Sequence, residues 1–585
     1  MVKLYAGNQV MTRELVPSRG FQSSVDYKMV FGLGKIDAID SVQITWPDRS
    51  VTTVSKPAIN KIHLVRKEES IRKRQQTQPV VIQPMFTKLP SSFDRHVEND
   101  VIDFYTERNI PKMLSREGPR AAVGDVNGDG LDDVFIGGTP GHPGQLYLQS
   151  RDGSFIKKEQ PAFRQFLDFE DVAVLLFDCD GDKDLDLLIC PGGNNVAANS
   201  RQLQLRLFKN DGKGNFVLDA DAFPNMGMNV SVAIANDING DGFPDLFIGA
   251  RSYPGTYGID PKSALFMNDG VGRFRDIAET NNKDIASIGM VCGAVWADVI
   301  GDHRKELVIA GEWMTPRVFA YNGGRFEEVK TNLDQLYGWW QTVNAADVNG
   351  DGKEDLILGN IGQNFYLRPD SLHPVKLWIN DYDQNGSIEK IMTYTISGRD
   401  MPVFLKRDME DQLPSIKKNN LKNEAYANKS IQELFPGQLD KAIVKKFTCA
   451  ASCIAINKGN GIFEVRPLPA MAQLSCINVV QPVDINNDGH TDLVLGGNQF
   501  EFLPQFERLD ASLGDVLMND GRGNFAWQEA RRTGLHLRGE VRDIATIRSA
   551  DQTRLLFLQN DSIPVLYGLR AANTLTQSSP GKTLK

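Results

Sequence analysis

The sequence contains an acidic nine-residue loop that recurs along the chain, each copy lying between two short apolar segments. The first copy, Asp125 to Asp133, has oxygen-bearing side chains at positions 1, 3, 5 and 9, glycine at position 6 and a main-chain carbonyl at position 7. This donor set suits a hard cation of flexible coordination, such as calcium. One Asx/Gly turn arises easily by chance, but five in the same register do not, so we predict calcium binding.

Five copies carry the complete pattern, and their predicted ligands are at positions 1, 3, 5, 7 and 9. These are Asp125, Asn127, Asp129, Leu131 and Asp133; Asp178, Asp180, Asp182, Asp184 and Asp186; Asp237, Asn239, Asp241, Phe243 and Asp245; Asp347, Asn349, Asp351, Lys353 and Asp355; and Asp484, Asn486, Asp488, His490 and Asp492. Lys183 replaces the turn glycine in the second copy. We therefore expect that site to be the weakest.

The spacing of the loops predicts the architecture. With a degenerate copy at Asp298 to Glu306 and a remnant at Asp543, the loops recur every 50 to 60 residues or so, apart from one longer interval. Each unit is expected to run strand, acidic loop, apolar strand, longer loop, strand, Asn/Asp-Gly hairpin and strand. The prediction is an all-β fold, a seven-bladed propeller with calcium loops spanning residues 84–570.

The longer interval lies in the fifth unit and contains an insertion at about residues 365–447. A sixth copy of the loop occurs within it, with predicted ligands Asp381, Asp383, Asn385, Ser387 and Glu389. Helical material follows, with a capping box at Ser430 to Glu433 and an amphipathic stretch at 439–447. We predict a mixed α/β insertion that contains a calcium-clipped hairpin.

The two ends of the propeller region indicate how the ring closes. The seventh unit supplies three strand candidates before a polar tail at 571–585, whereas Phe86 to Leu89 matches the outer strands of the other units. We predict that this N-terminal segment completes the last blade and removes an exposed edge. Upstream, residues 1–66 have the pattern of a small β domain, and 67–83 form a linker.

Both regions resemble known families. The repeat described above resembles the FG-GAP/VCBS repeat of bacterial surface proteins and of the integrin α-chain head. The N-terminal region contains a set of short motifs: Arg13-Glu14, Gly20 to Ser24, Phe31 to Gly34 and Val42 to Asp48. Through these motifs it resembles the ASPIC/UnbV domain, and cartilage acidic protein relatives combine both regions. Family members have strand sequence before the position of Tyr5, so the resemblance implies that the domain is truncated here.

Composition narrows the range of partners. The formal net charge is −9, and much of this acidity belongs to the predicted cation loops, which argues against nucleic acid as a partner. No apolar run approaches 18 residues, so no membrane span is predicted. The six cysteines are too scattered for a disulfide scaffold, and we interpret them mostly as buried thiols.

Strand parity predicts the face that binds a ligand. Loops between first and second strands hold the cations, so the other loops, including the insertion, emerge on the opposite face. Aromatic and amide side chains on that face suit a sugar or a peptide, although for any single tryptophan packing between blades is the favoured alternative. The ligand-face candidates are Tyr253, Trp313, Trp339, Trp340, Asn364, Asn498 and Phe500.

No catalytic motif occurs in the sequence, so we predict binding rather than catalysis. The leading hypothesis is a calcium-stabilised binding or adhesion propeller that recognises a glycan or a protein partner. The alternative is a polysaccharide-degrading lyase or hydrolase on the same scaffold. The expected location is extracellular, cell-surface or periplasmic, with the export signal lying outside this chain.

Overall fold

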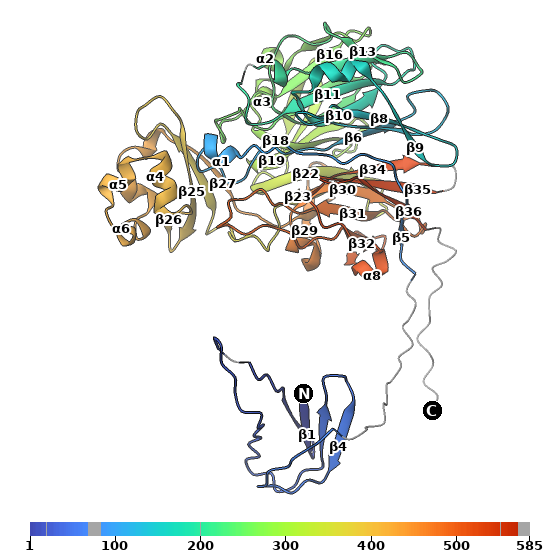
Figure 1. Ribbon diagram of the computed structural model, residues 1–585. Helices are drawn as coiled ribbons and strands as arrows, with labels where there is room; N and C mark the ends of the chain where they lie inside the picture. Colours follow the sequence, from blue (N-terminus) through green and yellow to red (C-terminus); the bar gives the residue numbers. More distant parts are fainter. Residues whose placement is uncertain (19, 68–82, 199, 550–551, 571–585) are drawn as a thin grey trace. The chain divides into compact units, whose positions relative to one another are not determined.

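The computed structural model describes the chain except for residues 19, 68–82, 199, 550–551 and 571–585 (Figure 1). Two compact units are present, Met1–Ile82 and Gln83–Lys585. The predicted tail, and the predicted linker apart from residues 67 and 83, lie outside the described residues. None of the described helices is long and apolar enough to cross a membrane.

The smaller unit is a four-stranded antiparallel sheet in the order β2-β1-β3-β4. Its strands are β1 (Val2–Ala6), β2 (Gln9–Arg13), β3 (Ser41–Thr45) and β4 (Val51–Ser55). Strands β3 and β4 form a hairpin, in which Ile44 pairs with Thr52 across the turn that follows Trp46. Leu4, Ala6 and Ile39 form a small core.

The larger unit is built mainly from four-stranded antiparallel sheets that follow one another along the chain. The first three are β6 (Ala121–Gly124), β7 (Asp133–Ile136), β8 (Gln145–Gln149) and β9 (Phe155–Lys158); β10 (Glu170–Phe177), β11 (Asp186–Gly192), β12 (Arg206–Asn210) and β13 (Phe216–Asp219); and β14 (Val230–Asn236), β15 (Asp245–Ala250), β16 (Ala264–Asn268) and β17 (Phe274–Asp276).

Two further groups of strands are joined where the end of β19 pairs with the start of β22. They are β18 (Met290–Ala297), β19 (Glu306–Met314), β20 (Arg317–Asn322) and β21 (Arg325–Val329), and β22 (Gly338–Ala346), β23 (Asp355–Asn360), β28 (Cys453–Asn457) and β29 (Phe463–Pro467). The last two sheets are β30 (Ile477–Val483), β31 (Asp492–Gly497), β32 (Asp515–Asn519) and β33 (Phe525–Trp527), and β34 (Val541–Arg548), β35 (Thr553–Gln559), β36 (Val565–Leu569) and β5 (Phe86–Lys88).

The first strands of these sheets contact one another in a closed circuit. The order is β6, β10, β14, β18, β22, β30, β34 and back to β6. Sheets pack face to face through buried side chains, as where Phe135 and Leu146 meet Leu187 and Phe208. The second strands are apolar, as predicted, because both of their faces are covered by neighbouring sheets.

The prediction that the N-terminal segment completes the last sheet is confirmed. Strand β5 pairs antiparallel with β36, with Phe86 opposite Leu569 and Lys88 opposite Tyr567. Phe86 is buried with Leu535, Leu537 and Phe557 in the core of the last sheets. The segment therefore adds both main-chain hydrogen bonds and apolar burial to the end of the chain.

The insertion interrupts the fifth sheet between β23 and β28 and forms a sheet of its own, in the order β26-β25-β24-β27 (Figure 1). Its elements are β24 (Val375–Asn380), β25 (Glu389–Ile396), β26 (Arg399–Pro402), α4 (Lys406–Gln412), α5 (Ser415–Asn419), α6 (Asn423–Ala427), α7 (Ile431–Leu434), η3 (Leu439–Lys441) and β27 (Ile443–Phe447). The capping box at Ser430 and Glu433 is confirmed. The helix expected at 439–447 is wrong: after one 3-10 turn the chain pairs with β24 as a strand, which buries Phe447.

Short helices complete the larger unit. They are α1 (Asp103–Thr106), η1 (Pro161–Phe166), η2 (Arg201–Leu203), α2 (Ala278–Asn281), α3 (Lys283–Ala286), η4 (Ala470–Leu474) and α8 (Ala530–Thr533).

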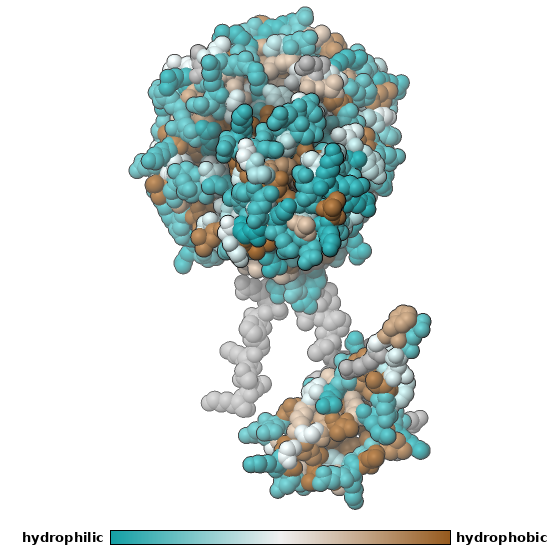
Figure 2. Space-filling view, turned by 90° about the vertical axis from the view of Figure 1, so that its left-hand side faces the viewer, coloured by the Kyte–Doolittle hydropathy of each residue, from teal (hydrophilic) through white to brown (hydrophobic). Residues whose placement is uncertain are grey.

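All six cysteines are free thiols and five of them are buried, which confirms the prediction that most are buried thiols. Figure 2 shows apolar residues as scattered small patches over the visible face of the larger unit.

Closure by β5 can be tested with two truncations. We expect removal of residues 1–70 to leave the larger unit folded. Removal of residues 1–92 takes away β5, exposes the edge of β36 and deletes a buried phenylalanine worth about 3 to 5 kcal/mol. Melting temperature and size-exclusion profiles should show lower stability and aggregation for the longer truncation. Identical behaviour of the two proteins would contradict the role given to β5.

Candidate cation loops and ligand pocket

Each acidic loop wraps around the carboxylate at its first position. Asp125 Oδ1 accepts a hydrogen bond from the backbone N–H of Gly128 at 2.7 Å, and its Oδ2 accepts one from Gly130 at 2.7 Å. Position 6 has positive φ in all the copies, including 82° at Gly130 and 86° at Gly386. This left-handed turn explains the preference for glycine there, and it curls the oxygen-bearing side chains toward one centre.

The acid at position 9 is buried and joins each loop to its sheet. Asp133 Oδ2 accepts from the N–H of Val126, and Oδ1 accepts from the N–H of Gln149 on the third strand, at 3.1 and 2.8 Å. Burial raises the pKa of Asp133 to about 6. The same two bonds recur at Asp186, Asp245, Asp355 and Asp492, all fully buried.

The donor set fits calcium. Two clusters bring three carboxylates together, with oxygen atoms all within 4.8 Å of one another: Asp178, Asp180 and Asp182 in the second loop, and Asp381, Asp383 and Glu389 in the insertion. In the other complete loops an asparagine amide takes the place of the second carboxylate. A mixed set of carboxylate, amide and carbonyl oxygens is what calcium binds in proteins.

The second loop differs from the others in two respects. Lys183 at position 6 has a φ of 75°, a conformation that strains residues with a side chain. In addition, the ammonium of Lys209 donates to Asp180 Oδ2 at 2.7 Å and to Cys179 Sγ at 2.8 Å. A cation in this loop must therefore compete with a lysine for one of its ligands.

Asparagines at the ends of third strands link successive sheets, a role that sequence reasoning did not identify. Asn210 Nδ2 donates to the carbonyl of Val126 in the preceding sheet's loop at 2.8 Å. Asn268, Asn457 and Asn519 make the equivalent bonds to Cys179, Val299 and Val348. The recurring Asn-Asp-Gly hairpin was the available signal, but we attributed it only to turn formation.

Burial shows that three of the residues predicted to contact a ligand are not on the surface. Trp313, Trp339 and Trp340 are at most 3% exposed. Trp313 stacks on Trp339 at 5.5 Å, and both rings contact Phe447 of the insertion. Trp313 and Trp339 therefore anchor the insertion to the sheets of the larger unit, because large rings gain most from full burial.

The remaining ligand-face candidates divide by exposure. Asn498 is fully buried, so the prediction that it contacts a ligand is also wrong. Its amide donates to the carbonyls of Ser512 and Gly539, and so fixes a turn. Asn364 is exposed, Tyr253 is half-buried, and Phe500 is half-buried beneath the guanidinium of Arg508 at 4.2 Å. The structure does not gather these three into one cavity.

Buried charges occupy the region between the sheets and the insertion. Lys112, fully buried, lies 3.6 Å from Glu312, which also pairs with Arg251 at 2.6 Å. Lys390 of the insertion pairs with Glu107, whose second oxygen accepts from Asn194 Nδ2 at 2.8 Å. All of these polar and charged side chains are buried.

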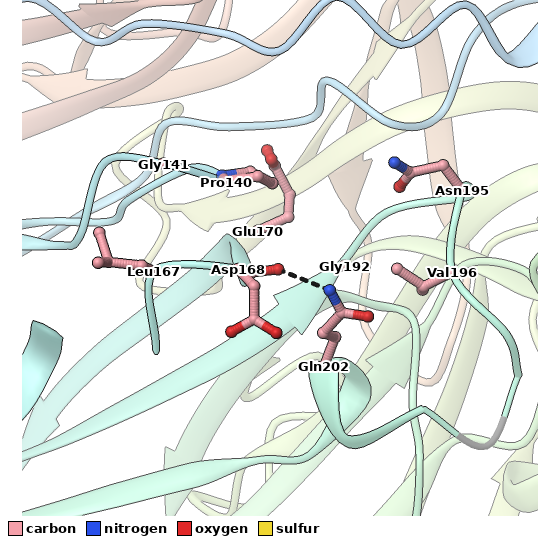
Figure 3. Close-up of a pocket in the computed structure, with 9 residues that line it drawn as sticks. All are labelled: Pro140, Gly141, Leu167, Asp168, Glu170, Gly192, Asn195, Val196 and Gln202. Atoms are coloured by element: carbon pink, nitrogen blue, oxygen red, sulfur yellow. Dashed lines mark hydrogen bonds between the residues drawn. The ribbon is translucent and has the colours of Figure 1, made fainter. Parts of the chain in front are cut away.

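A pocket lies on loops of the first two sheets (Figure 3). It has a volume of about 330 Å³. Leu167 and Asp168 lie opposite Asn195 and Val196, and Gln202 donates to the carbonyl of Asp168 at 2.9 Å. Its lining residues are Pro140, Gly141, Leu167, Asp168, Glu170, Gly192, Asn195, Val196 and Gln202.

Glu170 contributes its stem to the pocket wall, while both of its carboxyl oxygens are buried without a hydrogen-bond partner of good geometry. Burial, followed by the nearby carboxylates of Glu98 and Asp171, raises the pKa of Glu170 well above its ordinary value. Polar contacts with a ligand fall instead to Asp168, Asn195 and Gln202.

Comparison with protein families identifies both units. Residues 1–72 match the ASPIC and UnbV family. The FG-GAP-like repeat matches residues 125–189, 178–248, 237–309 and 298–358, and each match begins at position 1 of an acidic loop. The chain thus contains an ASPIC and UnbV domain followed by FG-GAP-like repeats, as predicted. Among the curated proteins compared with the chain, none matches it.

Solved structures similar to the chain include three with low sequence identity. A lectin of Agrocybe aegerita, described as recognising non-reducing terminal N-acetylglucosamine, is 16% identical with a TM-score of 0.40, over 71% of this chain and 80% of the lectin. An ancestral GH74 enzyme is 11% identical at 0.38, over 80% and 49%. The V. cholerae biofilm matrix protein Bap1 is 11% identical at 0.34, over 84% and 92%. These similarities carry no inference about function.

The asparagine links lead to a stability prediction. Replacing Asn210 by alanine removes the bond to Val126 and the acceptor of two hairpin N–H groups, Asp211 and Gly214. We expect a loss of about 1 to 3 kcal/mol in the free energy of unfolding, measured by urea denaturation. The control is Asn215→Ala, an exposed residue of the same hairpin, expected within about 0.5 kcal/mol of wild type. Equal losses would contradict a linking role.

Proposed function

We propose that the protein is a seven-bladed, calcium-stabilised propeller, extracellular, cell-surface or periplasmic, that binds a glycan or a protein partner on the face opposite its cation loops. One observation carries the proposal. The acidic loops all join first to second strands, whereas the pocket is formed by loops that join second to third strands or one sheet to the next. The two sets of loops emerge at opposite ends of antiparallel strands.

The closed circuit of first strands supports a blade count of seven, because each sheet in the circuit contributes one such strand. The oxygen-only ligand sets and the left-handed turn at position 6 support calcium as the cation. When bound, the ion would supply positive charge among carboxylates that otherwise repel one another. The residues that would hold it are those at positions 1, 3, 5, 7 and 9 of the loops, in the insertion as well as in the blades.

The lining of the pocket supports a sugar unit as the ligand group. Apolar side chains at Leu167 and Val196 offer surfaces for the face of a sugar ring, while the amides of Asn195 and Gln202 offer groups that pair with hydroxyls. Asn195 is exposed and Gln202 half-buried, so the contacts do not require the fold to open. An extended peptide has the same needs, which keeps a protein partner within the proposal.

Calcium removal is the first test. If each blade site has a dissociation constant of ~0.1 mM, then ~1 mM calcium stabilises the fold by roughly 1.4 kcal/mol per site. Five sites together approach about 7 kcal/mol, comparable with the ~5 to 15 kcal/mol stability of a domain. We therefore expect excess EGTA to lower the melting temperature markedly, and an unchanged melt would refute structural calcium.

The second loop provides a matched variant. Lys183→Gly removes the strained conformation without touching a ligand side chain, so we expect tighter calcium binding at this loop by calorimetry. The control is Lys213→Gly, which lies in a hairpin of the same sheet. A Lys183→Gly protein with unchanged affinity at every site would show that the backbone at position 6 does not limit binding.

Ligand binding is tested by screening glycan and protein arrays and then titrating the best ligand. We expect Asn195→Ala and Leu167→Ala each to weaken binding by about tenfold, or 1.4 kcal/mol. Asn215→Ala, an exposed amide in the hairpin between β12 and β13 at the cation-loop end of the second sheet, is the matched control. Unchanged binding in the pocket variants would overturn the site, and release of new sugar ends from a polysaccharide would favour the enzymatic alternative.

A further inference from the structure

A second cavity lies beside the pocket and differs from it in charge. This basic groove has a volume of about 240 Å³ and is lined by the turn that leads into β8, the end of β9 and the start of η1. Its charged lining residues are Asp94, Arg95, Lys157, Lys158, Glu159 and Arg164. Four cations therefore face two carboxylates, in a chain whose overall formal charge is −9.

The ion pairs in the groove leave positive charge available. Lys157 pairs with Asp94 at 2.7 Å, Arg164 with Glu159 at 3.0 Å, and Arg95 with Asp561, outside the groove, at 3.1 Å. All three pairs are substantially exposed, and such pairs contribute little stability, so an incoming anion can replace the carboxylates. The Lys158 ammonium donates only to the carbonyl of Lys213, and no carboxylate neutralises it within the described part of the chain.

Neutral donors accompany these cations. Gln145 accepts from the hydroxyl of Tyr147 through Oε1, and its Nε2 has no partner among the described residues. The exposed ring of His142 likewise has none there. A ligand that carries hydroxyls next to an anionic group satisfies both kinds of donor at once.

One short loop separates the basic groove from the pocket. Pro140 and Gly141 line the pocket, and the next residues, His142 and Pro143, line the basic groove. A ligand of more than one sugar unit can therefore extend from one cavity to the other across a single turn.

We propose that the basic groove binds the carboxylate or sulfate of an acidic saccharide whose neighbouring unit occupies the pocket. This inference rests on the proposed function and narrows it to anionic glycans. Lys158 and Arg164 supply the charge that discriminates an acidic unit from a neutral one, and Gln145 supplies a donor for a hydroxyl. Carboxylate and sulfate share this chemistry, so both classes enter the test.

The test compares charged and neutral oligosaccharides of equal length by calorimetry: a uronic acid oligomer, its carboxyl-reduced form and a sulfated oligomer. We expect at least tenfold tighter binding of a charged oligomer, with a preference that decreases as salt increases. The double variant Lys158→Gln with Arg164→Gln should lose the preference, whereas Lys213→Gln, an exposed lysine nearby, should retain it. Melting temperatures establish that each variant folds.

The outcomes separate the two proposals. Equal affinity for charged and neutral oligomers, weakened for both by Asn195→Ala, would overturn the basic groove and leave the proposed function standing. No binding to either class, with no hit on a glycan array, would refute saccharide recognition and the groove together. Equally tight, Lys158-dependent binding of a single-stranded oligonucleotide would overturn the assignment to saccharides.

Discussion

The buried acid at position 9 is the interaction on which the repeating structure depends. A carboxylate removed from water is costly unless hydrogen bonds compensate it. Asp133 obtains one bond from its own loop and one from the third strand of its sheet, and the same arrangement recurs in the other complete loops. This anchor fixes where each loop begins and ends, and so holds the carboxylates at positions 1, 3 and 5 over the same strands.

Hydrogen bonds from the third strands also connect each loop to the neighbouring sheet. The third-strand residue that donates its N–H to the position 9 acid also donates its side-chain amide to the loop of the preceding sheet, as Asn210 does to Val126. Gln149 acts in the same way across the junction, bonding to the carbonyl of Arg548 in the last sheet. An amide side chain, asparagine or glutamine, at this one position thus ties the cation loop to its own sheet and to its neighbour.

Repetition made most of the fold predictable from the sequence. Five similar loops set the strand order, and the three-strand last unit revealed that β5 must complete it. Exposure was not predictable in the same way: Trp339 and Asn498 have the chemistry of ligand contacts, but packing decides whether they face solvent, and both are buried. The pocket was also beyond sequence reasoning, because Pro140, Leu167 and Gln202 carry no signature and come together from three separate loops.

Aromatic packing and a buried ion pair attach the insertion to the sheets. Trp313 and Trp339 pack against Phe447, and Lys390 reaches Glu107, which also accepts from the backbone of Tyr257 at 2.6 Å. A buried ion pair with additional hydrogen bonds is expensive to separate, since either charge alone would remain desolvated. The insertion is therefore held firmly against the sheets, whereas the pocket lies on loops of the first two sheets.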